Sequence, residues 1–414
     1  MLASKNIVFV NYNAGSPYHG PNLRSFYQAK SLLGSCNVRI ISSSYSHKYH
    51  KEPDVTGVVT EEVIDEIPFY WLKVPKYKSI IMRIICQYIY GFFLIFNSRK
   101  LIPKNSILVF SCPPQDLIFF VLVVAYFRKA TLVTDVRDIW PLTQIQMSKK
   151  HLLNPYTYVL FLAQFLIYKF SVRVVSPLDS LYLQWPKVIG EKFRFIPNTS
   201  LPPLTEESDI QLKALYKPPL SVCSFPLDSI DSIENSSCLK IVYSGSFDRD
   251  NAFENLVFAA EQIEREDVVF IFMGDGIRKN WLLERVQGSK NIVVLEKLAP
   301  NQVIPFLRVC DVGFCGLHGK QIYEYGVSLG KSFEYLRASI PILWMVNSTP
   351  VLNEACVSVK VDDIDDLVVN IHKLANQIDE FRSLFDTKVE SLFLENYSEE
   401  AVRLRLESLF SEVL

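Results

Sequence analysis

Glycine is scarce in this chain, with 15 residues among 414, where average usage of about 7% would give about 29. After the first expected strand, the glycines do not have the G-x-G-x-x-G spacing of a dinucleotide-binding loop. Any anion-binding loop must therefore rely on single glycines between a strand and a helix.

Paired cysteines, metal-spaced histidines and excess charge are also absent. The eight cysteines include no C-x-x-C pair, a pattern typical of reduced thiols in a cytosolic protein and not of a disulfide scaffold or zinc site. The six histidines show no metal-ligand spacing, so no metal site is expected. The formal net charge is -1, which argues against nucleic acid as the main partner because phosphate-binding proteins usually carry a basic excess.

Long apolar runs are missing as well. The most apolar stretches, residues 116–127 and 156–168, fall short of the ~20 residues that span a bilayer. We expect buried helices there, with contact to a membrane surface as the alternative. The opening segment MLASKNIVFV leads directly into a strand pattern without the apolar run of a signal peptide, so a cytoplasmic location is expected.

What the chain does contain is an alternation of short apolar strands with helix-length segments. This order predicts parallel strands joined by crossover helices, and continuously apolar strands indicate a sheet covered on both faces. The expected strands are 7–10, 38–43, 107–111, 130–136, 172–176 and 193–197, followed by 240–245, 268–274, 291–296, 311–316, 340–345 and 357–361.

The alternation stops over residues 198–238, which are rich in Pro, Ser and acidic residues. We therefore predict an α/β protein with two Rossmann-like, doubly wound domains that face each other across a cleft. The predicted parts are a first domain 1–198, a linker with an insertion 199–239, a second domain 240–395 and a C-terminal helix 396–414. An apolar stripe on this helix predicts packing toward the first domain; it consists of Val402, Leu406, Leu409 and Val413.

In such sheets ligands bind at the carboxyl ends of the strands, and two segments of the first half follow strands. One is a loop with Gly15 and Gly20 that leads into a helix, whose free N–H groups can bind an anion. His19 in this loop could face the cleft. Arg24, in the first helical turn, opposes the helix dipole unless an anion lies nearby, and the alternative is a solvated side chain.

The second segment, residues 134–147, contains Asp135, Arg137 and Asp138. A carboxylate at this strand end could stabilise positive charge or accept a proton. The alternative is that one of the two aspartates caps the next helix.

In the second half, Gly245 and Ser246 form a strand–loop–helix segment in which Arg249 is the candidate cation for a diphosphate. The alternative is a surface arginine paired with a neighbouring aspartate. Gly274, after the next strand, belongs to a Gly-Asp-Gly turn that brings backbone close to a ligand.

Lys331 and Glu334 are three residues apart and share one helix face, where they could supply a cation for phosphates and a carboxylate for ribose hydroxyls. The alternative is an exposed ion pair worth under about 0.5 kcal/mol.

These segments resemble the GT-B-fold glycosyltransferases of family 4, the group with bacterial O-antigen and capsule transferases. The similarity follows the family's order through SPYHGPNLRSFYQAKSL, VRDIWP, FIPN, YSG, MGDG and YGVSLGKSFEYLRASIPIL. It implies a retaining hexosyl- or N-acetylhexosaminyltransferase that needs no metal or other cofactor and uses a nucleotide-diphosphate sugar, with UDP favoured. The implied acceptor is a saccharide linked to polyprenyl diphosphate, used in surface polysaccharide synthesis.

The resemblance also implies roles for single residues. Asp138 would lie near the anomeric carbon, and Lys331 and Arg249 would stabilise the leaving diphosphate. The donor-binding residues would be Gly15, Gly20, Gly245, Ser246, Gly274, Leu298, Ser328 and Glu334, and the acceptor-side residues His19, Arg24 and Arg137.

The chain departs from the family pattern in three places, one of which is Thr199, where the family usually has the glycine of IPNG. The loop after the second-domain strand is reduced to DRDN, and Gly326 stands where the first glutamate of the usual Glu-x(7)-Glu pair occurs. Two alternative functions therefore stay open: a nucleotide-sugar epimerase of the same fold, and a non-catalytic partner subunit.

The segment 73–100 mixes Lys, Arg, Tyr and apolar residues. It could lie on a membrane with its basic groups toward anionic lipid, which predicts a peripheral protein at the inner face of the cytoplasmic membrane. The alternative is a buried helix with basic ends.

Overall fold

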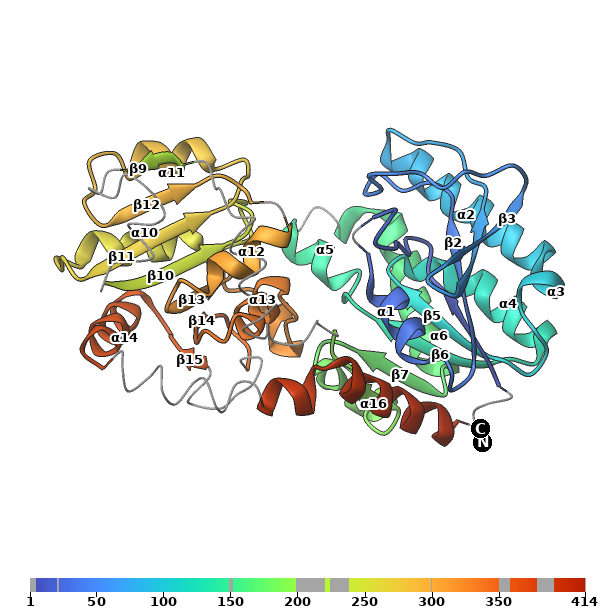
Figure 1. Ribbon diagram of the computed structural model, residues 1–414. Coiled ribbons are helices and arrows are strands. Elements are labelled where there is room, and N and C mark those ends of the chain that lie inside the picture. Colours follow the sequence, from blue (N-terminus) through green and yellow to red (C-terminus); the bar gives the residue numbers. More distant parts are fainter. Residues whose placement is uncertain are drawn as a thin grey trace. The chain divides into compact units, whose positions relative to one another are not determined.

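The apolar runs of the first half form an eight-stranded sheet with the order β3-β4-β2-β1-β5-β6-β7-β8 (Figure 1). All neighbouring strands are parallel except β3 and β4. The strands are β1 (Asn6–Val10), β2 (Asn37–Ser43), β3 (Val59–Ile64), β4 (Ile67–Leu72), β5 (Ile107–Cys112), β6 (Thr131–Val136), β7 (Arg173–Ser176) and β8 (Phe193–Phe195). The six strands expected in this half are confirmed.

The computed structural model describes residues 5–20, 22–148, 152–198, 220–223, 238–298, 300–349, 358–377 and 391–413. The chain divides into one unit of residues 1–199 with 399–414 and a second of residues 200–398.

The β3–β4 hairpin was not expected from the sequence. Its two-residue turn consists of Asp65 and Glu66, which both have positive φ angles of 46° and 67°. Such turns usually contain Asn-Gly or Asp-Gly, so the absence of glycine hides this hairpin from pattern analysis.

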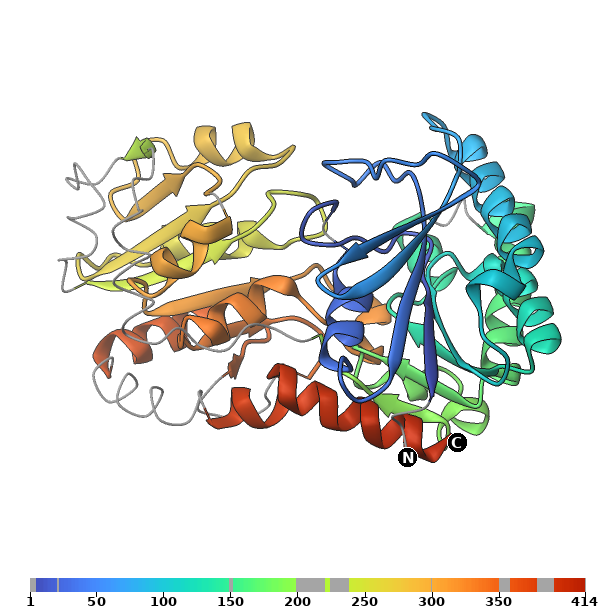
Figure 2. The ribbon, with the colours of Figure 1, turned by 45° about the vertical axis from the view of Figure 1, so that its right-hand side comes forward.

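Helices cover both faces of the first sheet. On one face lie α1 (Arg24–Ser31) and the C-terminal α16 (Glu399–Glu412), which contact each other (Figure 2). Val402, Leu406 and Leu409 of α16 are buried in the same apolar cluster as strand residues of this sheet. The predicted apolar stripe therefore completes the core of the first unit.

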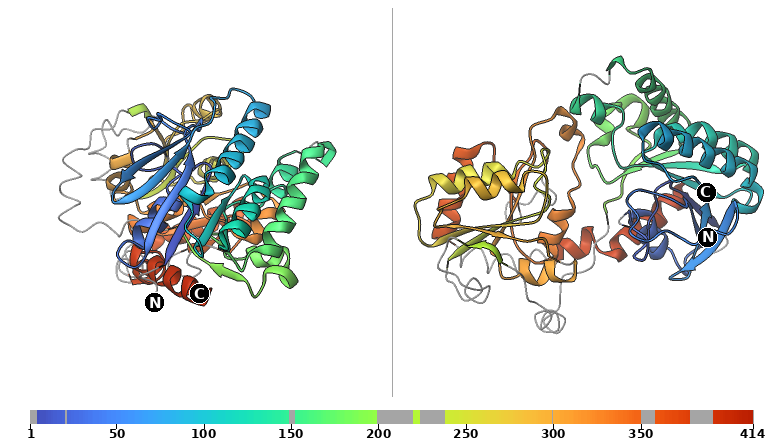
Figure 3. Two further views of the ribbon diagram at one scale, coloured as in Figure 1. Left: turned by 90° about the vertical axis from the view of Figure 1, so that its right-hand side faces the viewer. Right: turned by 90° about the horizontal axis from the view of Figure 1, so that it is seen from above.

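The other face of the first sheet carries α2 (Ile80–Phe96), α4 (Ile118–Arg128) and α6 (Pro155–Phe170), with α4 contacting both neighbours (Figure 3). Short helices complete the unit: α3 (Ser98–Leu101), α5 (Leu142–Met147), α7 (Pro186–Ile189), and the 3-10 turns η1 (Gln115–Leu117) and η3 (Leu181–Gln184). The helices predicted at 116–127 and 156–168 are present, but only their inner faces are buried, since Tyr126 is 79% and Tyr158 65% exposed. Within the described ranges, no helix is long and apolar enough to cross a membrane.

The second unit has a seven-stranded sheet with the order β15-β14-β13-β10-β11-β12-β9. Its strands are β9 (Leu220–Cys223), β10 (Leu239–Ser244), β11 (Val268–Met273), β12 (Ile292–Leu295), β13 (Val312–Gly316), β14 (Ile342–Met345) and β15 (Ser358–Lys360), and the six that were expected are confirmed. Only β9 is antiparallel to its neighbour. It lies inside the predicted linker 199–239, where a run of four residues is too short to show periodicity; residues 199–219 and 224–237 lie outside the described part.

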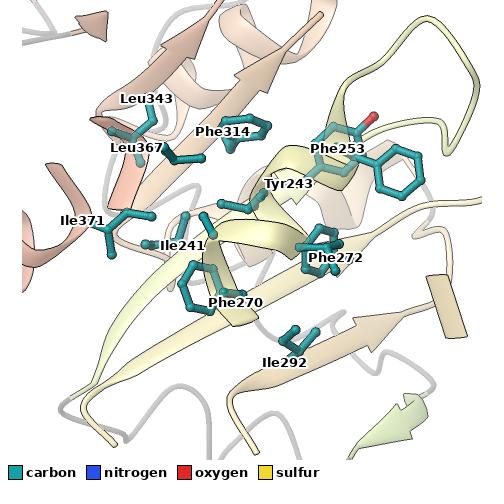
Figure 4. Packing of buried hydrophobic residues seen from close by; sticks show 14 of the residues in the cluster. Ile241, Tyr243, Phe253, Phe270, Phe272, Ile292, Phe314, Leu343, Leu367 and Ile371 are labelled. Carbon is teal, nitrogen blue, oxygen red and sulfur yellow. The ribbon is translucent and has the colours of Figure 1, made fainter. Parts of the chain in front are cut away.

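Two apolar clusters sandwich this second sheet. One includes residues of α10 (Phe253–Gln262), α11 (Lys279–Arg285) and α14 (Ile364–Asn376), and Figure 4 shows Phe253 and Leu367 packed over Tyr243 and Phe314. The other includes residues of α12 (Pro300–Leu307) and α13 (Gly330–Arg337). The 3-10 turn η4 (Gln321–Tyr325) precedes α13. Both units are therefore doubly wound α/β sheets, as predicted.

Candidate functional site

A cavity of about 520 Å³ lies at the carboxyl ends of β10, β11 and β12 in the second unit. This edge is where ligands bind in open α/β sheets. The lining comes from the three loops that follow these strands, together with α12 and α13; its residues are Ser244, Gly245, Ser246, Met273, Gly274, Asp275, Gly276, Lys297, Leu298, Val303 and Glu334. Gly245, Ser246, Gly274, Leu298 and Glu334, which the resemblance implied for donor binding, thus line one cavity.

Two glycines allow the loops after β10 and β11 to lie directly against each other. The Gly245 amide donates a hydrogen bond of 3.0 Å to the Met273 carbonyl. Gly274 has a φ of +155°, and a Cβ added to it would lie 1.8 Å from the carbonyl oxygen of Gly245. No other residue fits at position 274, so exposed backbone of both loops forms part of the cavity wall.

The Lys331 ammonium lies against the loop after β10. Its Nζ is 4.2 Å from the centroid of the Tyr243 ring and donates a hydrogen bond of 3.1 Å to Oδ1 of Asn251. A Cβ added to Gly245 would lie 3.3 Å from the same Nζ. Burial lowers the pKa of Lys331 to about 8, because loss of water disfavours the charged form. An anion beside this ammonium would therefore be favoured.

Glu334 lines the cavity one helical turn after Lys331. Burial raises the pKa of Glu334, and the charges of Lys331 and Arg337 oppose that rise. Both Lys331 and Glu334 are half-buried. The alternative of an exposed ion pair therefore does not describe them.

Three residues predicted in the second unit, Lys331, Arg249 and Ser328, are not part of the cavity lining. Arg249 is exposed in the loop after β10, and Ser328 lies in the segment between η4 and α13. Sequence reasoning missed Lys297, which lines the cavity directly before Leu298. The signal that could have found it is its place two residues after β12.

The first unit contains a second cavity, of about 590 Å³, at the carboxyl ends of its strands. The segments after β1, β2, β4, β5 and β6 and the first half of α2 surround it; the lining residues are Asn13, Asn22, His47, Lys48, Tyr77, Arg83, Gln87, Pro113, Pro114, Arg137 and Trp140. Of the residues predicted in this half, the lining includes only Arg137.

Asp138 stabilises the start of α5. Its Oδ1 accepts hydrogen bonds from the Ile139 amide and the Thr143 hydroxyl, at 2.8 and 2.5 Å, and its Oδ2 accepts one of 2.9 Å from the Trp140 indole. The N-cap residue of α5 is Pro141, without a side-chain cap hydrogen bond, so Asp138 does not cap this helix in the way that the sequence left open beside the catalytic role. The same bonds fix the Trp140 ring, which lines the cavity.

Arg24 is fully engaged inside the first unit. Its guanidinium lies 2.9 Å from the buried Asp135 carboxylate and donates to the carbonyls of Ile196 and Pro197 and to the side-chain oxygen of Asn198. The anion that balances this cation in the first turn of α1 is therefore Asp135.

His19, Gly15 and Gly20 shape the loop after β1. His19 is buried, hydrogen-bonded to Ser16 at 2.8 Å and packed on the Trp71 ring with centroids 5.1 Å apart. A Cβ added to Gly15 would lie 2.3 Å from the Gly20 carbonyl oxygen, so the loop doubles back on itself. None of the three lines the cavity.

Apart from Arg137, the cations of this cavity were not predicted from the sequence. Arg83 was considered only as part of the segment 73–100, and His47 and Lys48 were not assigned to a site. The loop and helix that carry them are distant in sequence, so no local pattern places them at one cavity. Their position after the ends of β2 and β4 is the signal that could have been used.

No protein-family model matches the sequence, and no curated protein sequence matches it. Solved structures do match over nearly its full length. HepE of Anabaena in complex with UDP superimposes with a TM-score of 0.65 at 10% identity, covering 99% of this chain and 100% of that one. This chain has the GT-B fold.

Other GT-B glycosyltransferase structures agree. Sucrose-phosphate synthase of Thermosynechococcus elongatus matches with a TM-score of 0.66 at 13% identity, covering 99% of this chain and 98% of that one. WaaG, a glycosyltransferase of lipopolysaccharide biosynthesis, matches with a TM-score of 0.60 at 12% identity, covering 97% and 98%. At these identities the GT-B likeness establishes the fold alone.

Proposed function

We propose that the protein is a glycosyltransferase that moves a hexosyl or N-acetylhexosaminyl group from a nucleotide-diphosphate sugar, with UDP as the favoured nucleotide. The observation that carries this proposal is the position of Lys331 and Glu334, one turn apart on α13 beside the glycine loops of the second unit. The half-buried ammonium meets the diphosphate, and the carboxylate accepts hydrogen bonds from ribose hydroxyls. The fold likeness to HepE, whose structures contain UDP and UDP-glucose, supports the choice of donor.

Transfer proceeds with retention and without a metal or other cofactor. Lys331, Lys297 and the backbone amides of the glycine loops stabilise negative charge on the diphosphate as the bond from the anomeric carbon to the phosphate oxygen breaks. An oxocarbenium-like sugar forms, as in glycoside chemistry generally. The acceptor oxygen bonds to the anomeric carbon from the leaving-group side, and its proton passes to the departing phosphate oxygen. When a donor is bound, the positive charge of Arg249 also stabilises the negative charge on the diphosphate.

For the acceptor we propose a saccharide linked to polyprenyl diphosphate, used in surface polysaccharide synthesis of the O-antigen or capsule type. The resemblance to family 4 supports this assignment. The enzyme would then work as a peripheral protein at the inner face of the cytoplasmic membrane.

The helical face of the first unit supports the peripheral location. Ile81 and Phe96 of α2 are 70% and 78% exposed, and Phe127 of α4 is 65% exposed. No acidic residue occurs between Glu66 and Asp116. The basic residues of this acid-free stretch are Lys73, Lys76, Lys78, Arg83, Arg99, Lys100 and Lys104. Apolar side chains beside cations suit an anionic lipid surface.

Sugar transfer is tested with nucleotide sugars alone and with a prenyl-diphosphate saccharide. Thermal stabilisation by a nucleotide sugar identifies the donor, since a ligand of the native state raises its stability. Product that forms only when the acceptor is present supports transfer. Epimerised or hydrolysed donor in the absence of acceptor would instead identify an epimerase. Failure to bind any nucleotide diphosphate would identify a non-catalytic subunit.

The role of Glu334 is tested by comparing the affinities of UDP and its 2′,3′-dideoxy analogue. We expect the protein to prefer UDP, and Glu334→Ala to remove the preference. A preference that persists in the variant would contradict the assigned contact with ribose.

The membrane face is tested by flotation with phosphatidylcholine vesicles that contain or lack phosphatidylglycerol. Phe96→Glu and Phe127→Glu should each weaken binding about tenfold or more, because burying such a side chain contributes about 1.5–3 kcal/mol. Val369→Glu on α14 is the matched control, since Val369 is 63% exposed in the second unit. Equal binding by all variants would rule out this face.

A further inference from the structure

The side chain of Asn251 connects two groups that border the cavity of the second unit. Its Oδ1 accepts a hydrogen bond of 3.1 Å from Nζ of Lys331. Its Nδ2 donates to the carbonyl and hydroxyl oxygens of Ser246, at 3.2 and 3.0 Å. Ser246 lines the cavity together with Gly245, and the Lys331 ammonium lies against Gly245. One amide therefore joins a hydroxyl and an ammonium at the place proposed for the diphosphate.

The chemistry of its two neighbours fixes the direction of this amide. The Lys331 ammonium can only donate and the Ser246 carbonyl can only accept, so the amide oxygen must face Lys331 and the amide nitrogen must face Ser246. An aspartate of nearly the same shape could bond to Lys331, but its second oxygen would face the Ser246 carbonyl without a hydrogen between them. A side-chain amide therefore satisfies both neighbours, whereas a carboxylate does not.

This direction also determines what the Ser246 hydroxyl can do. A hydroxyl has one hydrogen and two lone pairs, and the Ser246 oxygen uses one lone pair to accept from Asn251. Its hydrogen can therefore be donated to a ligand in the cavity. The Tyr243 hydroxyl donates to the Ser246 carbonyl at 2.6 Å, so the backbone that carries this serine is held from a second side.

Two neutral groups hold the Lys331 ammonium. One is the Asn251 amide oxygen, and the other is the face of the Tyr243 ring, whose centroid lies 4.2 Å from Nζ. Cys315 of β13 and Glu334 of α13 raise the pKa of Lys331, but burial outweighs them and lowers it to about 8. The ammonium has three N–H groups, so the bond to Asn251 fixes its direction and leaves two for phosphate oxygens.

The loop after β10 has other contacts that do not need this amide. The backbone of Asn251 forms a bridge with Leu317, which depends on main-chain atoms alone. The Phe247 amide donates to the Asp275 carbonyl at 2.9 Å, and Asp250 forms an ion pair with Lys320. The loop is therefore connected to its neighbours without the Asn251 side chain, which can serve to orient the groups that bind a ligand.

We propose that Asn251 is a positioning residue of the donor site, which directs the Lys331 ammonium and the Ser246 hydroxyl toward one phosphate group of the nucleotide diphosphate. The inference rests on the proposed glycosyltransferase function and adds a residue to its donor side. The neutrality of the amide is essential, because a carboxylate at this position would itself pair with Lys331 and repel the phosphate.

Asn251→Asp and Asn251→Ala test this role in titrations of the full-length protein with UDP between pH 6.5 and 9.5. Each variant should weaken UDP binding about tenfold or more, the effect of losing one charge-assisted hydrogen bond. The affinity of the unaltered protein should decline above about pH 8. Asn251→Asp should move this decline to higher pH, because a carboxylate favours the charged ammonium. Asn251→Ala should move it to lower pH, because the charged form loses a hydrogen bond.

Asn280 of α11 provides matched controls, since it is exposed and lies outside the cavity lining. Asn280→Asp and Asn280→Ala should bind UDP as the unaltered protein does at every pH. A decline that moves in the same direction in both Asn251 variants, or equally in Asn280→Asp, would overturn the proposal, because a loosened loop or a general change of charge would then explain it.

A double-mutant cycle tests the link to Ser246. Ser246→Ala should weaken UDP binding, and adding Asn251→Ala should then reduce the affinity less than it does in the unaltered protein, because the hydroxyl that the amide directs is already absent. Losses that simply add would overturn the link between the two residues. Failure of UDP to bind the unaltered protein would contradict the proposed function and this inference together. Equal binding of UDP by the unaltered protein and both Asn251 variants would leave that function intact and overturn the positioning role.

Discussion

Replacing Lys331 by alanine should weaken UDP binding and remove a pH dependence. The ammonium lies against the Gly245 loop and donates its hydrogen bond to a neutral amide oxygen, so a bound diphosphate would receive a charge-assisted hydrogen bond from it. Such bonds contribute about 1.5–3 kcal/mol, which corresponds to about 10- to 100-fold in the dissociation constant.

The pH dependence follows from the lowered pKa of about 8. Below pH 8 the free protein already carries the charged ammonium, and the affinity for UDP is at its maximum. Above pH 8 the free protein loses this proton, whereas the bound diphosphate favours the protonated form. The affinity should therefore fall by up to about tenfold per pH unit above pH 8, because one proton is taken up on binding.

Isothermal titration with UDP between pH 6.5 and 9.5 measures both effects. Lys331→Ala should bind weakly with no decline above pH 8, and Lys290→Ala, an exposed lysine outside the cavity, should behave as the unaltered protein does. The reasoning is refuted if Lys331→Ala keeps full affinity, or if the decline above pH 8 persists in this variant.

Three further substitutions test the local geometry and the packing. Gly274→Ala should abolish UDP binding, since its Cβ would overlap the Gly245 carbonyl oxygen, while Gly319→Ala, where a Cβ meets no atom within 4 Å, should bind normally in the same titration. Asp138→Ala should lower the stability of the first unit by about 1.5–3 kcal/mol, the usual contribution of hydrogen bonds to a charged group, because its carboxylate accepts bonds from Ile139, Trp140 and Thr143; chemical denaturation measures this, and an unchanged midpoint would contradict it. Leu406→Ala on α16 should lower the stability of the first unit by about 2–5 kcal/mol, because this side chain is buried in the apolar core of that unit. Leu404→Ala is the control, since Leu404 is exposed.

The alternation of apolar runs was enough to predict both sheets. Each apolar run that was expected to be a strand is one. A strand buried on both faces must be apolar throughout, and its crossover helix must follow it in the sequence. The exceptions are informative. The β3–β4 hairpin turns at Asp65 and Glu66 without a glycine, and β9 is held by its pairing with β12 and not by its own four residues.

Lys331 and Glu334 could be named from their spacing, since residues three apart on a helix share one face. Only the tertiary structure placed them against loops that follow β10 and β11, because Gly245 and Gly274 approach each other across 29 positions of sequence. It also showed that Arg24 is neutralised by Asp135 inside the first unit.

The sequence by itself therefore determined the layers of this protein, since local periodicity records which side chains meet a core. The partners of charged side chains depend on contacts between segments far apart in the chain. Lys48 and Arg83 come from different elements and meet at one cavity only because their strands end at the same edge of the sheet, and no local pattern records that meeting.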